Sequence, residues 1–266
     1  MFARAIVIDS GYAHAFAGVA DCCSFLYMYF DASEDNLKEA IAASRRAVEL
    51  DPESAEAHAS RGLAESLSKN YDAAEKEFDH SLRLNPKLFE ACYFYARSSF
   101  AQGKMEQAGS LFQKASCLNP ADYQSRMSLG NCLQSIGRPE EAREAFADAL
   151  RVAERHLEVY PEDVRALYLG AGALSQLGDR QRSLEWATRA LAIDSEESTI
   201  LYNVACTYSL LGEKEKSLDC LEKAVHNGFG HKEWIENDPD FRSLHDHPRF
   251  KALLQGLSVD ASKTSI

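Results

Sequence analysis

Small residues return every 34 positions along this chain, and the spacing limits what the chain can fold into. Gly62, Ala96 and Gly130 keep this interval, and so do two further sets, Ala74, Ala108 and Ala142, then Phe78, Phe112 and Phe146. A fixed period of this length is typical of stacked repeats, in which each unit packs on its neighbours and no single core forms.

Each repeat has the pattern of two helices. Residues 89–101 carry apolar side chains at helical spacing, and Gly103 interrupts that pattern. A second helix is predicted from about Glu106 to Leu118, before Asn119 and Pro120, because proline cannot continue a helix and restricts the residue before it. Small residues at fixed positions allow two helices to approach to roughly 8–10 Å between their axes. The sequence therefore predicts an all-α chain of helix pairs.

The same register divides the chain into units. Positions eight, twenty and twenty-seven, counted from Ala55, are Ala, Gly or Ser throughout six units. We expect the second helix of an incomplete repeat in 1–12, six units in 13–54, 55–88, 89–122, 123–163, 164–197 and 198–228, a cap in 229–258, and a flexible tail in 259–266. The half-unit also predicts that Met1 lies close to a natural or engineered cut in a longer chain.

Two units are longer than the others. The first has extra residues near 26–36, and the fourth has them near 151–160. Such insertions are sites for specialised contacts, although neutral insertions remain an alternative.

These residues resemble the tetratricopeptide repeat. The resemblance rests on Leu129, Gly130, Leu133, Ala142, Phe146, Ala149, Pro86 and Pro120. It implies a right-handed superhelical solenoid with a C-terminal helical cap. His58, Cys92 and Arg126 depart from the pattern, because a large residue is usual at their position. The chain also resembles the C-terminal repeat regions of bacterial signalling proteins with cyclase, winged-helix or kinase domains, which implies a regulatory role.

The resemblance further implies a concave groove lined by the first helix of each unit. The predicted groove residues are Asp21, Tyr93, Arg97, Phe100, Met127, Asn131, Gln134, Arg165, Tyr168, Tyr202 and Asn203. Arginine can hold a carboxylate through two parallel hydrogen bonds. Alternatively, the tyrosines only pack between neighbouring helices. The carboxylate clamp of chaperone-binding relatives is not reproduced, because Ala17, Ala59 and Tyr93 stand at one of its positions.

Composition excludes several classes of function. The net charge of -12 argues against a general nucleic-acid binder, which needs a basic surface. No apolar run reaches the roughly 18–20 residues of a membrane span. Seven cysteines without a C-x-x-C spacing favour a reduced, cytoplasmic protein with no disulfide, metal or cofactor.

A histidine- and aspartate-rich region near the C-terminus is the one candidate for other chemistry. It contains His226, His231, His245 and His247, with Asp238, Asp240 and Asp246. Its spacing matches no metal or catalytic motif, so we interpret it as a structural cap, with a metal site and catalysis as alternatives.

Together, these features predict a non-catalytic scaffold that binds a protein or peptide. The alternative is a self-association module, a homodimer formed through the open N-terminal face and the apolar patch at 25–30. The third and least supported hypothesis is an enzyme that uses the C-terminal histidines.

Overall fold

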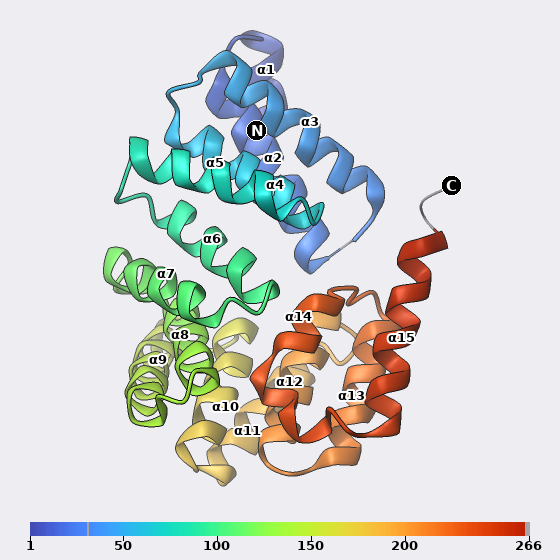
Figure 1. Ribbon diagram of the computed structural model, residues 1–266. Coiled ribbons are helices and arrows are strands. Elements are labelled where there is room, and N and C mark those ends of the chain that lie inside the picture. Colours follow the sequence, from blue (N-terminus) through green and yellow to red (C-terminus); the bar gives the residue numbers. More distant parts are fainter. Residues whose placement is uncertain (31, 264–266) are drawn as a thin grey trace. The chain divides into compact units, whose positions relative to one another are not determined.

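The computed structural model describes residues 1–30 and 32–263, with side chains as far as residue 257. The described residues form helices and no strand (Figure 1), so the all-α repeat prediction is confirmed. The helices are α1 (Phe2–Ile8), α2 (Ala13–Tyr29), α3 (Glu34–Leu50), α4 (Ala55–Leu67), α5 (Tyr71–Leu84), α6 (Phe89–Ala101), α7 (Met105–Leu118), α8 (Tyr123–Ser135), α9 (Pro139–Val159), α10 (Val164–Leu177), α11 (Arg180–Ile193), α12 (Ser198–Leu210), α13 (Lys214–His226), α14 (Lys232–Asn237), the 3-10 helix η1 (Pro239–Leu244) and α15 (Pro248–Lys263). Helix α15 extends into the predicted tail, and residues 264–266 lie outside the described chain.

Local chemistry explains where the helices begin. Asp122 accepts hydrogen bonds from the amides of Gln124 and Ser125 at the start of α8, and Glu197 does the same for α12. These caps satisfy amides that have no partner inside the helix. Capping side chains therefore fix where these two helices begin.

The turns inside the repeats require a left-handed residue. Gly137, Gly178 and Gly212 have φ angles of 76°, 88° and 77° there. The second repeat has no glycine at this turn, and Lys69 takes the same conformation at φ 62°. A side chain is disfavoured in this region, so this turn is the strained member of the series.

The small repeat positions let a ring lie against the facing helix backbone. Phe78 is fully buried, and a Cβ atom added to Gly62 would lie 2.8 Å from two carbons of its ring. Where serine replaces alanine, its hydroxyl is hydrogen-bonded across the pair, as from Ser183 to the Ala171 carbonyl oxygen at 2.9 Å. Position eight therefore stays small because the ring leaves no space.

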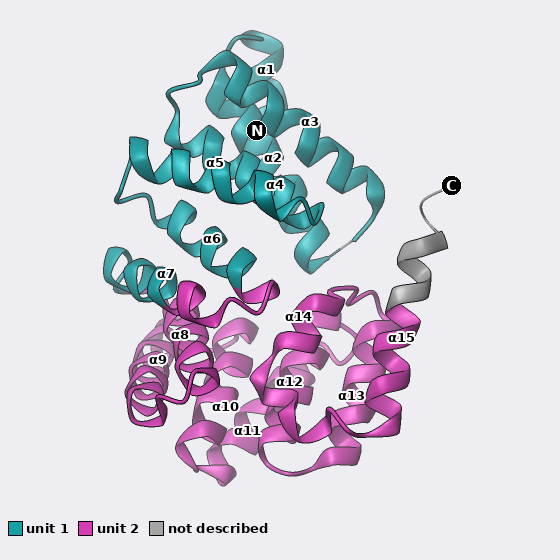
Figure 2. Ribbon diagram, viewed as in Figure 1, with its two compact units in different colours: residues 1–99, 110–120 teal, residues 100–109, 121–266 magenta. Residues whose placement is uncertain are grey.

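The chain forms two compact units (Figure 2). Unit 1 comprises residues 1–99 and 110–120, and unit 2 comprises residues 100–109 and 121–266. No described helix is long and apolar enough to cross a membrane.

The C-terminal residues complete the core of unit 2. Ile235, Phe241, Leu244 and Phe250 are almost fully buried in a cluster with residues of α12 and α13, including Leu218. Helix η1, which precedes α15, contacts α8 and α12, which are the first helices of their repeats.

Candidate peptide-binding face

The structure separates the predicted groove residues into two groups. The buried group contains Tyr93, Phe100, Met127, Asn131, Tyr168 and Tyr202. The partly exposed group contains Asp21, Arg97, Gln134, Arg165 and Asn203. In unit 2, burial of this face comes partly from the chain's own residues 234–240, which we call the capping segment.

Trp234 and Asn237 hold the capping segment to the end of α6. The Trp234 ring lies 4.5 Å from the Phe100 ring, centroid to centroid, at an angle of 35°. The Asn237 side-chain amide donates a hydrogen bond of 3.0 Å to the carbonyl oxygen of Ala101. This combination of a ring contact and a main-chain contact is also available to a bound peptide.

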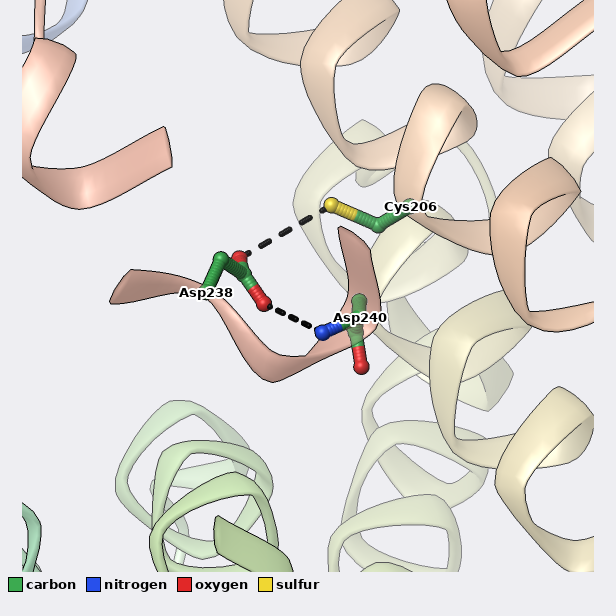
Figure 3. A group of neighbouring side chains, drawn as sticks. All are labelled: Cys206, Asp238 and Asp240. Atoms are coloured by element: carbon green, nitrogen blue, oxygen red, sulfur yellow. Dashed lines mark hydrogen bonds between the residues drawn. The ribbon is translucent and has the colours of Figure 1, made fainter. Parts of the chain in front are cut away.

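Asp238 is held at positions that the repeat register assigns to the groove. The hydroxyl of Tyr202 donates to Asp238 Oδ2, and the Sγ atom of Cys206 lies 3.9 Å from the same oxygen. Asp238 Oδ1 accepts a 3.0 Å bond from the amide of Asp240, so Asp238 caps the start of η1 (Figure 3). The Tyr202 ring also stacks on the Phe229 ring, with 4.2 Å between the ring centres.

Asp240 is held by two further residues. Gln176 Nε2 donates to Asp240 Oδ1 at 3.0 Å, and Ser209 Oγ donates to its main-chain oxygen at 2.7 Å. Cys206 and Ser209 stand at positions nine and twelve of the sixth unit. Our choice of groove residues omitted both, although the register that selected Tyr202 also selects them.

Burial controls the charge of this acidic pair. Burial raises the pKa of Asp240 well above its usual value, and the charge of Asp238 raises it further. Burial also raises the pKa of Asp238, but hydrogen bonds from Tyr202 and the Asp240 amide oppose that rise. Asp240 is therefore the carboxyl group that retains a proton more readily.

The pair and Cys206 offer a thiol and two carboxylates within 4.8 Å of one another. All three are buried, and both Asp238 oxygens accept hydrogen bonds from groups that a metal ion would have to displace. None of the four histidines belongs to this group. The geometry thus fits a structural hydrogen-bond network better than a metal site, because metal ligands need lone pairs that no hydrogen bond occupies.

The capping segment is too deeply packed to leave readily. Ile235 of the segment has no exposed surface, and neither do Phe241 and Leu244, which directly follow it in η1. Exposing three such side chains costs more than about 5 kcal/mol, which is comparable with the whole stability of many domains, about 5–15 kcal/mol. We therefore treat the segment as part of the fold of unit 2.

Unit 1 presents a different set of inner-face groups. Asp21 accepts a hydrogen bond from Ser60, while its Oδ1 atom has no partner. Burial, with repulsion from Glu90, raises the pKa of Asp21 to about 6 despite that bond. The Arg97 guanidinium lies 5.6 Å from the centre of the Tyr29 ring. This face combines an unsatisfied carboxylate acceptor with aromatic surface.

The remaining candidates make local contacts. Arg165 Nε donates to the Tyr168 hydroxyl at 3.3 Å, and Asn203 Nδ2 donates to the Thr199 carbonyl oxygen at 2.8 Å. Asn131 Oδ1 and Gln134 Oε1 are buried without a hydrogen-bond partner. Their role in binding stays a prediction.

Comparisons with known proteins place this fold in a family. Models of the tetratricopeptide repeat match residues 32–89, 123–196 and 198–225, which together cover more than half of the chain. The chain matches no curated protein sequence.

Several solved structures share the fold. The human IFIT1 dimer with PPP-AAAA has a TM-score of 0.62 at 15% identity, covering 99% of this chain and 65% of that one. The APC/C hetero-tetramer Cut9-Hcn1 has a TM-score of 0.61 at 13% identity, covering 97% of this chain and 45% of that one. PilF of Pseudomonas aeruginosa has a TM-score of 0.51 at 17% identity, covering 92% and 99%. At such identities the likeness concerns the fold alone. From its repeats and its helix pairs, the chain belongs to the tetratricopeptide repeat family.

Proposed function

We propose that the chain is a non-catalytic scaffold that binds a protein or peptide on the inner face of its first helices, and that it acts in regulation in the cytoplasm. One observation carries the proposal. Groove positions of the sixth repeat hold a peptide segment, with Tyr202 bonded to Asp238 and Ser209 bonded to Asp240. Here the segment belongs to the same chain.

The corresponding face of unit 1 is the better candidate for a separate partner. Asp21 offers an unpaired carboxylate oxygen, and Ser24 offers a fully buried hydroxyl without a partner. Buried polar groups without partners are costly, and a ligand that supplies hydrogen bonds removes that cost. An extended peptide carries suitable main-chain amides along its length.

Affinity capture with paired variants tests the proposal. The inner-face variant carries Asp21→Asn and Arg97→Gln, and the control carries Glu34→Gln and Lys38→Gln, which remove an exposed ion pair on α3 in the same unit. Each variant loses one acid and one base, so the net charge is preserved. We expect the wild type and the control to retain a common partner and the inner-face variant to lose it. Equal retention by all three proteins would show that binding uses another surface.

Exposed apolar side chains near the N-terminus favour self-association as a second candidate function. Val7 and Ile8 are each 86% exposed on α1, and Tyr12 is 48% exposed. Burying such a surface against a second copy is favourable. Sedimentation equilibrium at rising concentration should show dimers that Val7→Asp and Ile8→Asp abolish. The control Ile193→Asp changes an exposed apolar residue elsewhere. A strict monomer at all concentrations would exclude this function.

A further inference from the structure

The second helix of the fourth repeat ends beside a hollow that the inner-face proposal does not use. Helix α9 has 21 residues, whereas α5 and α11 have 14 each. At 3.6 residues per turn, the difference adds about two turns. The hollow lies at the end of this extension and measures about 540 Å³. Its lining residues are His156, Val159, Tyr160, Pro161, Glu162 and Asp163.

The extension is firmly attached to unit 2. Val152, Ala153 and Leu157 are buried against α10 and α11 in one apolar cluster. Because this side of the extension is packed, its other side is displayed on a rigid support. The extension therefore does not serve only to link two repeats.

The floor of the hollow is held by hydrogen bonds. His156 Nε2 lies 2.9 Å from Asp163 Oδ2, and Asp163 Oδ1 accepts a 3.0 Å bond from the Ala166 amide at the start of α10. Partial burial alone would raise the pKa of Asp163, but these bonds hold it below its usual value. Arg189 donates to the Pro161 carbonyl oxygen at 3.1 Å. Asp163 therefore stays ionised in a fixed position at neutral pH.

The surface chemistry combines exposed apolar groups with negative charge. Val159 is 67% exposed and Tyr160 is 60% exposed, although side chains of this kind are normally buried. Glu162 and Asp163 line the same hollow, and the carbonyl end of α9 adds partial negative charge. The Arg189 guanidinium is engaged with the Pro161 carbonyl oxygen, and Asp163 is paired with His156, so Glu162 presents the negative charge that a partner meets first. A partner that complements this surface presents an apolar side chain next to a cation.

We propose that this hollow is a second docking surface, which binds a peptide segment with an apolar side chain beside lysine or arginine. The net charge of -12 attracts such a segment from a distance. The surface lies entirely in unit 2 and does not involve Asp21 or Arg97. It is thus independent of the inner-face site.

Two probe peptides of the same length separate charge from apolarity. One alternates lysine with leucine, and the other alternates glutamate with leucine. Both are acetylated and amidated, and each is titrated into the full chain labelled with nitrogen-15. We expect the basic peptide to shift the amide resonances of residues 156–163 in a saturable manner, and the acidic peptide to leave them unchanged. Equal shifts with both peptides, or no shift with either, would overturn the proposal.

Exposed substitutions then test the residues. Val159→Ser with Tyr160→Ser should weaken binding of the basic peptide by at least about fivefold, because apolar contact is lost. Glu162→Lys should also weaken binding of the basic peptide, because the new lysine repels the peptide's lysines. Ile193→Ser, an exposed apolar residue outside the hollow, is the matched control. Unaltered affinity in the first two variants would refute the assignment. The inner-face proposal is tested separately, by the capture experiment with the Asp21→Asn and Arg97→Gln variant.

Discussion

The substitution Gly62→Ala tests the rule that underlies the repeat period. The new methyl group would lie 2.8 Å from two carbons of the Phe78 ring and 3.0 Å from a third. Ordinary contacts between carbon atoms are about 3.5–4.0 Å, and Phe78 is fully buried. The ring therefore cannot turn toward solvent, and α4 and α5 must separate or distort.

Two opposing terms determine the size of the effect. Replacing glycine by alanine inside a helix gains about 1 kcal/mol. Overpacking a core costs about 1–3 kcal/mol, so we expect a net loss of about 1 kcal/mol in the free energy of unfolding. Gly256→Ala is the matched control, because an added Cβ atom there meets nothing within 4 Å. The same chemical change should stabilise α15 by about 0.5–1 kcal/mol.

Urea unfolding with two probes measures the result. Circular dichroism reports both units, whereas the only tryptophans, Trp186 and Trp234, lie in unit 2. Gly62→Ala should move the circular dichroism transition to lower urea, and adding Phe78→Leu should recover part of the loss. If Gly62→Ala stabilised the protein as much as Gly256→Ala does, the ring would not be the reason for the small residue.

Three further predictions concern buried polar groups. Tyr202→Phe removes the hydroxyl that donates to Asp238, and it should destabilise unit 2 by about 1–3 kcal/mol in tryptophan-monitored unfolding. The folded-state pKa of Asp240 is raised, so the protonated acid is favoured in the fold and stability should fall as pH rises through that pKa. Asp240→Asn should reduce this slope in unfolding measured from pH 5 to pH 9, and an unchanged slope would contradict the assignment. A thiol reagent at neutral pH should modify exposed Cys117 rapidly, whereas Cys132, whose pKa burial raises to about 12, should react only on unfolding.

The sequence predicted the parts of the fold that repeat. The helix expected over residues 89–101 is α6, and Gly103, which was expected to interrupt the helical pattern, has a positive φ angle. These features depend on contacts between neighbouring helices, which recur in each unit and leave a periodic pattern. A packing rule that acts at each repeat can be recognised because six copies of it are present.

The register predicted a cap in 229–258 but not where the capping segment docks, because its contacts occur once. Asn237 is hydrogen-bonded to Ala101, which is 136 residues away in the sequence. A periodic pattern carries no information on such a pair. The register predicted where a ligand would lie, but it could not predict that unit 2 supplies residues 234–240 itself.

The acidic residues of the capping segment are the reason why we expect a partner to bind elsewhere. Asp238 and Asp240 are polar residues that a purely apolar cap would not need. Tyr202 donates to the Asp238 carboxyl group, Gln176 donates to that of Asp240, and Ser209 donates to the Asp240 main-chain oxygen. Because these donors already bond to the capping segment, the inner face of unit 2 has few donors left for a second peptide. The Oδ1 atom of Asp21 has no hydrogen-bond partner, and Tyr160 is 60% exposed although its ring contacts His156. We therefore expect a partner to gain free energy by binding at either site.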